Sequence, residues 1–73
     1  MTFHLEHGVT YRARIAIPWF VSRATAKEKL EGRGFTGVLI YSDGGGFIAQ
    51  GTWGGATQDV ELPSQIKGVP WEY

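Results

Sequence analysis

The chain of 73 residues balances seven lysines and arginines against seven aspartates and glutamates, and it contains no cysteine. This length suits one domain near the lower limit for independent folding. Without cysteine, disulfides and thiolate metal sites are excluded, and the balanced charge argues against strong non-specific binding of nucleic acid. Three tryptophans, three tyrosines and four phenylalanines indicate a core packed through a few large side chains.

No stretch of the sequence is suited to spanning a membrane. The longest apolar run, residues 15–21, is interrupted by Pro18 and is far shorter than the ~20 residues that span a bilayer. Residues 1–8 lack a basic stretch followed by an apolar one, so they do not resemble a secretion signal. We therefore expect a soluble, cytoplasmic protein in which residues 1–8 are a solvated N-terminal leader.

The clearest local pattern lies in residues 9–17, where apolar side chains occupy every second position from Val9 to Ile17. This period of two predicts a strand with one buried face. Pro18 ends the strand because proline cannot donate to a ladder. A short helix is predicted next, over residues 22–31, since Ser22 is a good N-cap and strong helix formers follow it.

Residues 35–42 and 47–53 predict two further strands joined as a hairpin. The glycine-rich segment 43–46 between them invites comparison with a phosphate-binding loop. Such a loop carries a lysine and leads into a helix, whereas this segment has no lysine and leads into an apolar strand. We therefore interpret it as a turn. Residues 54–73 look irregular, with a short strand at 59–62, one helical turn at 63–67 and an extended aromatic end.

This order predicts an α+β fold: a single small β-α-β-β domain over residues 1–73, with its core at 9–53 and an irregular tail at 54–73. We expect a three-stranded mixed sheet with one helix packed on one face, plus a short C-terminal turn and an aromatic tail. The first strand lies beside either the second or the third. We favour the third strand in the centre, as in a split βαβ unit, because this explains Phe47 and Trp53 as core anchors.

The hairpin register decides which side chains share a face. If Ser42 lies opposite Phe47, the second face of the sheet carries Arg12, Arg14, Leu39, Tyr41, Ile48, Gln50 and Thr52. One short helix cannot cover both faces of a sheet. The second face is then covered by the aromatic tail through Trp71, by a second copy of the chain, or by a foreign partner.

Two adjacent aromatic residues, Trp19 and Phe20, separate the first strand from the helix. We favour a hydrophobic staple, in which both rings pack under the start of the helix. The alternative is an exposed binding anchor.

No catalytic residue, metal ligand or cofactor site is predicted. His4 and His7 have a spacing that brings two imidazoles together, but no further ligands accompany them, and metal sites need three or four. The carboxylates form no poised pair, and a nucleophile with its base is absent. We therefore expect a protein that is not an enzyme, with no evident small-molecule substrate.

Leu30, Gly34-Phe35 and Val38-x-Ile40 form a pattern that resembles the first half of ferredoxin-like small domains, including the peptidoglycan-binding SPOR domain. The resemblance covers residues 9–53 and implies the split βαβ half of that fold. The second half departs from it, because no full second helix follows, so glycan binding is not carried over.

A second resemblance is to short bacterial and prophage-encoded reading frames. It rests on Tyr11-Arg12-Ala13, Gly34-Phe35-Thr36, Gly51-Thr52-Trp53 and Leu62-Pro63 ahead of Gln65-Ile66. It implies an accessory or assembly protein, such as one in a phage structural or host-interaction module.

Our first hypothesis is a small protein–protein interaction or assembly module that self-associates or binds a protein partner. The expected contact residues are Arg12, Arg14, Leu39, Tyr41, Ile48, Trp71 and Tyr73. The alternative is a binder of single-stranded nucleic acid or glycan that uses the same sheet face, although the zero net charge makes nucleic acid the less expected ligand.

Overall fold

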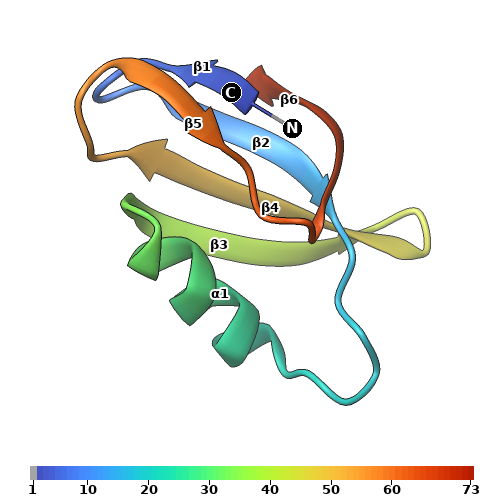
Figure 1. The fold of residues 1–73 in the computed structure, drawn as a ribbon. Helices are drawn as coiled ribbons and strands as arrows, with labels where there is room; N and C mark the ends of the chain where they lie inside the picture. Colours follow the sequence, from blue (N-terminus) through green and yellow to red (C-terminus); the bar gives the residue numbers. More distant parts are fainter. Residues whose placement is uncertain (1) are drawn as a thin grey trace.

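The computed structural model describes residues 2–73, which form six strands and one helix. The elements are β1 (Thr2–Leu5), β2 (Thr10–Ile15), α1 (Arg23–Gly32), β3 (Phe35–Asp43), β4 (Gly46–Trp53), β5 (Gln58–Glu61) and β6 (Ile66–Glu72). Four strands form one sheet in the order β3-β4-β2-β6, and β1 pairs with β5 in a separate two-stranded ribbon (Figure 1). The fold is thus a small α+β structure with one helix.

The predicted hairpin is confirmed in β3 and β4, with Ser42 opposite Phe47. Its turn is tighter than expected, because only Gly44 and Gly45 lie between the strands, with φ of 58° and 83°. Such positive φ angles are the ones that two-residue hairpin turns require and glycine permits. The backbone therefore confirms that this glycine-rich segment is a hairpin turn.

The favoured strand order is confirmed, since β4 pairs with both β2 and β3. The prediction of a three-stranded mixed sheet is wrong, because the sheet has four strands and every pairing between neighbours is antiparallel. Strands β2 and β3 run parallel to each other, but β4 lies between them. The helix α1 therefore connects two strands that are not neighbours, as in a split βαβ unit.

The leader expected at residues 1–8 is a second wrong prediction. Residues Thr2–Leu5 form β1, and Leu5 is only 1% exposed. The partner strand β5 begins more than fifty residues later in the chain, at Gln58. A strand of four residues gives no strong local pattern, so only this distant pairing reveals it.

The expectation of an irregular C-terminal tail is also corrected. The short strand predicted at 59–62 is present as β5 (Gln58–Glu61), whereas Ile66–Glu72 form a strand, β6, along the free edge of β2 where only an extended aromatic end was predicted. The predicted helical turn is a single turn closed by the Ile66 N–H on the Pro63 carbonyl, at 3.0 Å. Gly68 and Pro70 obscured β6 in the sequence, but an edge strand tolerates both residues.

One face of the four-stranded sheet, the inner face, carries the core. Leu30 of α1 packs with Ile15, Val38 and Ala49, while Leu5 of β1 packs in a second cluster with Tyr11, Trp53 and Leu62. In Figure 1, α1 lies along β3 and the β1–β5 ribbon lies beside β2. Because β-strand side chains alternate, these inner residues place the helix and the ribbon on the same side of the sheet.

The opposite side, the outer face, has no covering element among residues 2–73. The aromatic tail does not fold across it, because β6 extends the sheet at its edge. No helix within the same residues has the length and hydropathy needed to cross a membrane.

Trp53 joins the ribbon to the sheet and is only 4% exposed. Its indole N–H donates to the Ala56 carbonyl at 2.8 Å, and its ring lies 5.1 Å from the ring of Phe35. Glycines surround this ring: a Cβ on Gly55 would lie 2.6 Å from a ring carbon and a Cβ on Gly34 would lie 3.0 Å away. The Trp53 ring therefore fits against Gly34 and Gly55 because glycine has no side chain at these positions.

Leu5→Ala is expected to lower the free energy of unfolding by about 2–5 kcal/mol, the usual cost of truncating a fully buried leucine. His4→Ala on the same strand is the control. The His4 side chain is exposed and its ion pair with Asp59 is worth at most about 1 kcal/mol. Urea unfolding followed by circular dichroism measures both. Equal small losses would show that β1 is not part of the cooperative core.

Gly55→Ala is expected to cost about 1–3 kcal/mol, because its Cβ overlaps the Trp53 ring. Gly32→Ala is the matched control, since no atom lies within 4 Å of its Cβ and alanine favours the helix by up to about 1 kcal/mol. Thermal unfolding of the two variants gives shifts of opposite sign. A neutral Gly55→Ala would contradict the packing around Trp53.

Candidate interaction surfaces

The outer face is built from cross-strand rows of side chains. One row runs from Leu39 through Gln50 and Arg12 to Trp71, and the next runs from Tyr41 through Ile48 to Arg14. Leu39 is 56% exposed, Trp71 44% and Tyr73 72%. The structure therefore brings together six of the seven predicted contact residues on one exposed surface.

The seventh residue, Ile48, is only 3% exposed. It lies on the central strand, between Tyr41 and Arg14 in the register. At this exposure Ile48 offers almost no contact surface, so the prediction of Ile48 as a contact residue is wrong.

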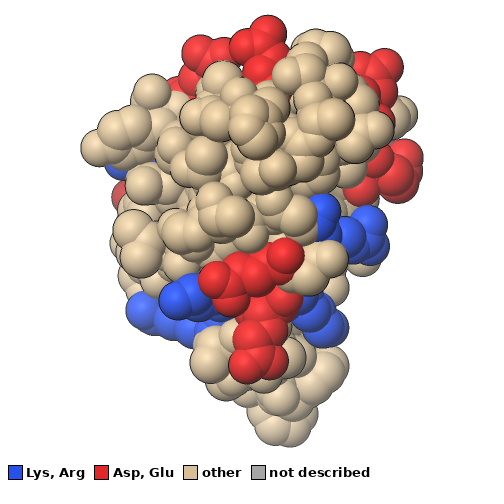
Figure 2. Space-filling view, turned by 90° about the vertical axis from the view of Figure 1, so that its left-hand side faces the viewer, with Lys and Arg blue, Asp and Glu red and all other residues tan. Residues whose placement is uncertain are grey.

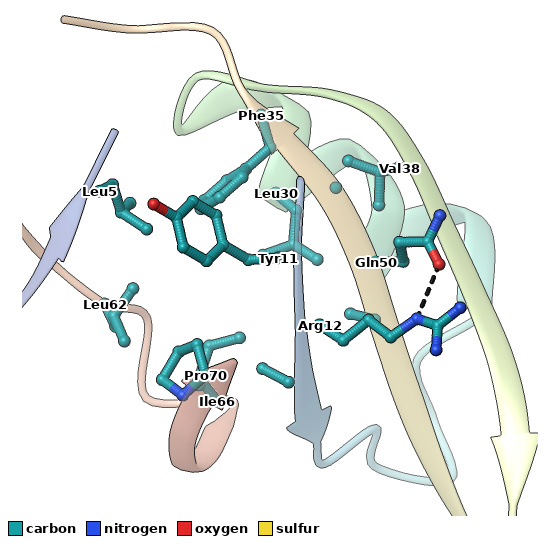
Figure 3. Close-up of a pocket in the computed structure, with 13 residues that line it drawn as sticks. Leu5, Tyr11, Arg12, Leu30, Phe35, Val38, Gln50, Leu62, Ile66 and Pro70 are labelled. Carbon is teal, nitrogen blue, oxygen red and sulfur yellow. Dashed lines mark hydrogen bonds between the residues drawn. The ribbon is translucent and has the colours of Figure 1, made fainter. Parts of the chain in front are cut away.

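Arg12 connects the centre of the outer face to the end of the chain. Its Nε–H donates to Oε1 of Gln50 at 2.9 Å (Figure 3), and its guanidinium carbon lies 4.0 Å from the centre of the Tyr73 ring. The Tyr73 N–H in turn donates to the Thr10 carbonyl at 2.9 Å. Tyr73 is thus both exposed and held in place.

The outer face carries an excess of positive charge. Arg14 donates to the Asp43 carbonyl at 3.0 Å and to the Asp43 carboxylate at 3.2 Å, so its charge is partly compensated. Arg12 bonds to an uncharged amide, and no carboxylate among residues 2–73 pairs with it. Within residues 2–73, Arg14 therefore has an acidic partner and Arg12 has none.

A second exposed surface lies in the loop between β2 and α1. Trp19 is 95% exposed and Phe20 is 71% exposed, with their rings 5.6 Å apart at an angle of 88°. They occupy the tip of a turn closed by the Val21 N–H on the Pro18 carbonyl, at 2.9 Å. This loop is the lowest part of the molecule in Figure 1, and the tip of the lowest lobe in Figure 2 is uncharged, with acidic side chains above it.

The preferred interpretation of Trp19 and Phe20 as a hydrophobic staple is therefore wrong. Ser22 caps α1, because its Oγ accepts from the Thr25 N–H at 3.2 Å. A staple uses the residue just before the cap and the fourth helical residue, which here are Val21 and Ala26. Placing the cap at Ser22 already implied this, so the sequence contained the signal that both aromatic rings lie outside the staple.

An apolar groove of about 370 Å³ opens beside this turn. Its walls come from the end of β2, the β2–α1 loop, α1 and the turn between β5 and β6. Phe20, Val21, Ala26, Leu30 and Pro63 supply much of the apolar lining, and the charged residues that line it, Lys29 and Lys67, are both basic. Sequence reasoning missed this groove because segments more than forty residues apart form it.

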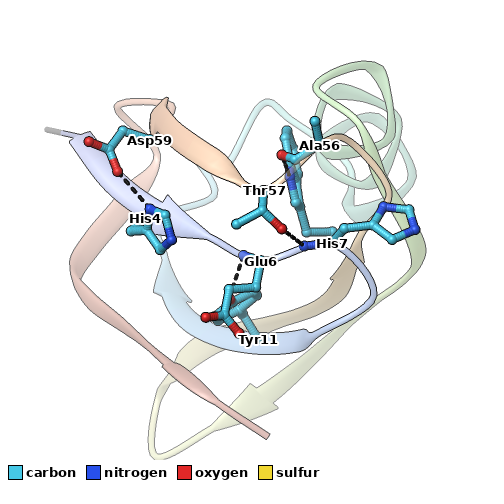
Figure 4. A network of polar contacts seen from close by, with 8 residues as sticks. His4, Glu6, His7, Tyr11, Ala56, Thr57 and Asp59 are labelled. Carbon is cyan, nitrogen blue, oxygen red and sulfur yellow. Dashed lines mark hydrogen bonds and ion pairs between the residues drawn. The ribbon is translucent and has the colours of Figure 1, made fainter.

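The two histidines form polar contacts within the β1–β5 ribbon and the loop that leads into it (Figure 4). His4 Nδ1 lies 2.8 Å from a carboxylate oxygen of Asp59, and His7 Nδ1 lies 2.9 Å from the Gly55 carbonyl. The backbone N–H of His7 donates to Thr57 Oγ1 at 3.0 Å. Within residues 2–73, no group of three His, Cys, Asp or Glu side chains could hold a metal.

A second, smaller apolar pocket has a volume of about 30 Å³ and is lined by Tyr11, Leu30, Phe35 and Val38 among others (Figure 3). This volume is far below the several hundred Å³ of a small-molecule site.

No family model, curated protein or solved structure matches this chain. The exposed surfaces described above are therefore what indicates a function for this chain.

Trp19→Ala is expected to change the free energy of unfolding by less than about 0.5 kcal/mol, because the side chain is exposed. A ring buried as a staple would cost about 3–5 kcal/mol on truncation. Urea unfolding monitored by circular dichroism tests this, with Trp53→Ala as the destabilised reference. A large loss for Trp19→Ala would mean that the ring packs on its own domain in solution.

Proposed function

We propose that this chain is a small non-enzymatic interaction module that binds a protein partner across the outer face. The observation that carries the proposal is the one-sided cover of the sheet. Both α1 and the β1–β5 ribbon pack on the inner face, which leaves four strands open on the other side. An open sheet face of this size with exposed aromatic residues is typical of a binding surface.

The composition of the outer face supports a protein ligand. Tyrosine, tryptophan and arginine are the residues enriched at binding hot spots, and the face presents Tyr41, Trp71, Tyr73 and Arg12 together with Leu39. The stacking of Arg12 on Tyr73 holds two of these side chains before binding. Such preorganisation lowers the entropy cost of complex formation.

Charge indicates the chemistry of the partner. The outer face carries two arginines and one aspartate, and Lys67 lies beside Arg14 in the register. It therefore favours an apolar surface that also carries carboxylates. Two copies of this chain packed face to face would instead bring arginines toward arginines. The charge balance therefore favours a foreign, acidic partner over a homodimer through this face.

Single-stranded nucleic acid is a second candidate ligand. Exposed aromatic rings beside arginines resemble the stacking platforms that such ligands use. Here the rings lie on the two edge strands, Tyr41 on β3 and Trp71 on β6, with Gln50 and Arg12 between them. This spacing across the sheet suits a flat protein surface at least as well as a row of stacked bases.

Photo-crosslinking tests the proposed partner surface. A photoreactive amino acid at Leu39 is expected to capture a defined protein in cells of the source organism, whereas the same group at Lys27, an exposed position on α1, is not. The captured protein, purified, should bind the wild-type chain. Arg12→Glu should weaken that binding at least about tenfold, as expected for a charge at a hot spot.

Equal capture from positions 39 and 27, or binding that Arg12→Glu leaves unchanged, would contradict the proposal. A labelled single-stranded oligonucleotide tests the second candidate at low salt, where phosphate binding is strongest. Salt-sensitive shifts of the Arg12, Arg14 and Trp71 resonances would assign the outer face to nucleic acid.

A further inference from the structure

The aromatic turn and the groove lie side by side and have complementary properties. Trp19 projects from the tip of the turn and is not part of the groove lining, whereas Phe20 lines the groove and contacts the Trp19 ring edge to face. We propose that two copies of this chain associate by exchanging these parts, with Trp19 of each copy inserted into the groove of the other.

The shape of the surface supports a closed pair. The projecting Trp19 ring and the groove belong to the same region of one chain. Two copies related by a two-fold axis beside this loop can therefore form both ring-in-groove contacts at once. Such a self-complementary contact is the commonest arrangement in homo-oligomers. The groove of about 370 Å³ is large enough to receive an aromatic side chain.

The chemistry of the groove fits an indole. Its walls are largely apolar, and its charged lining residues are two lysines. A lysine ammonium is attracted to the face of an aromatic ring, most strongly to tryptophan. The same positive charge disfavours a basic segment as the occupant. A carboxylate would be attracted by the lysines but would lose its hydration against the largely apolar walls, so an aromatic, uncharged ring is the better fit.

The closed turn that carries Trp19 limits the backbone freedom that association must remove. The hydrogen bond from Val21 to Pro18 closes the turn, and the Ser22 cap fixes its junction with α1. Little backbone freedom is then lost on binding, and tryptophan has only two side-chain torsions to order.

The area available predicts a weak dimer. Aromatic side chains bury roughly 150–250 Å² each, so the four rings of two turns account for roughly 600–1,000 Å² of the interface. Stable interfaces bury about 1,200–2,000 Å² in total. With the groove walls added, the contact reaches the lower end of this range, and we expect a dissociation constant on the order of 0.1 mM.

Two variants separate the two halves of the contact. Trp19→Ala removes the inserted ring and keeps the groove, while Ser64→Phe fills the apolar groove from an exposed turn position and keeps the ring. Each variant alone should dimerise at least about tenfold more weakly than the wild type. An equimolar mixture should recover dimer, because the mixed pair retains one intact ring-in-groove contact.

Sedimentation velocity over a concentration series measures dimer formation, and ¹⁹F NMR of 5-fluorotryptophan reports whether the Trp19 environment changes with it. Trp71→Ala is the matched control, since it removes an exposed tryptophan from the outer face and should leave the dimer unchanged. The same variant should impair partner binding through the outer face, so failure of one proposal is distinguishable from failure of the other.

Three results would overturn the inference. One is a wild-type chain that stays monomeric up to about 1 mM, well above the affinity expected for such an interface. Another is a dimer lost in Trp71→Ala and kept in Trp19→Ala, which would move the contact to the outer face. The third is a monomer whose Trp19 signal changes only with phosphatidylglycerol vesicles, which would assign the turn to a lipid surface.

Discussion

The burial of Trp53 is the constraint on which the rest of this structure depends. The Trp53 backbone bonds to Val9 and Gly8, its indole N–H bonds to Ala56, and its ring occupies space kept open by glycines. These contacts bring the start of β2, the end of β4 and the loop toward β5 to one point. The β1–β5 ribbon can then lie over the sheet, although its strands are too short to be stable alone.

This ribbon explains how a chain of only 73 residues builds a core. One helix buries little apolar area by itself, and α1 contributes just two buried residues, Ala26 and Leu30. The ribbon adds Leu5 and the following segment adds Leu62 on the same side of the sheet. The helix and the ribbon both cover the inner face of the sheet. A chain this short has no further element to cover the outer face, which therefore remains open.

Local sequence patterns were sufficient to predict the elements that depend on interactions between residues close together in the chain. The alternation around Tyr11, the Ser22 cap and the glycines of the hairpin turn each act over a few residues, and the strands, helix and turn that they predict are present. The pairing of β1 with β5 depends on contacts across most of the chain, and no short pattern contains it. The outer-face residues of β2, β3 and β4 followed from the hairpin register, whereas the place of Trp71 and Tyr73 beside them depends on β6, which was not predicted. The groove likewise required the distant turn near Ser64 to be placed against α1.

The two edges of the four-stranded sheet differ from regular strands in a way that limits how copies can assemble. The β3 edge has a register shift between Thr36 and Leu39, where Gly37 has φ of 60°, and the β6 edge has a shift beside Gly68 and contains Pro70. Irregular edges with glycine and proline are poor templates for another strand. Continuous growth of this sheet from molecule to molecule by edge-to-edge strand pairing is therefore disfavoured.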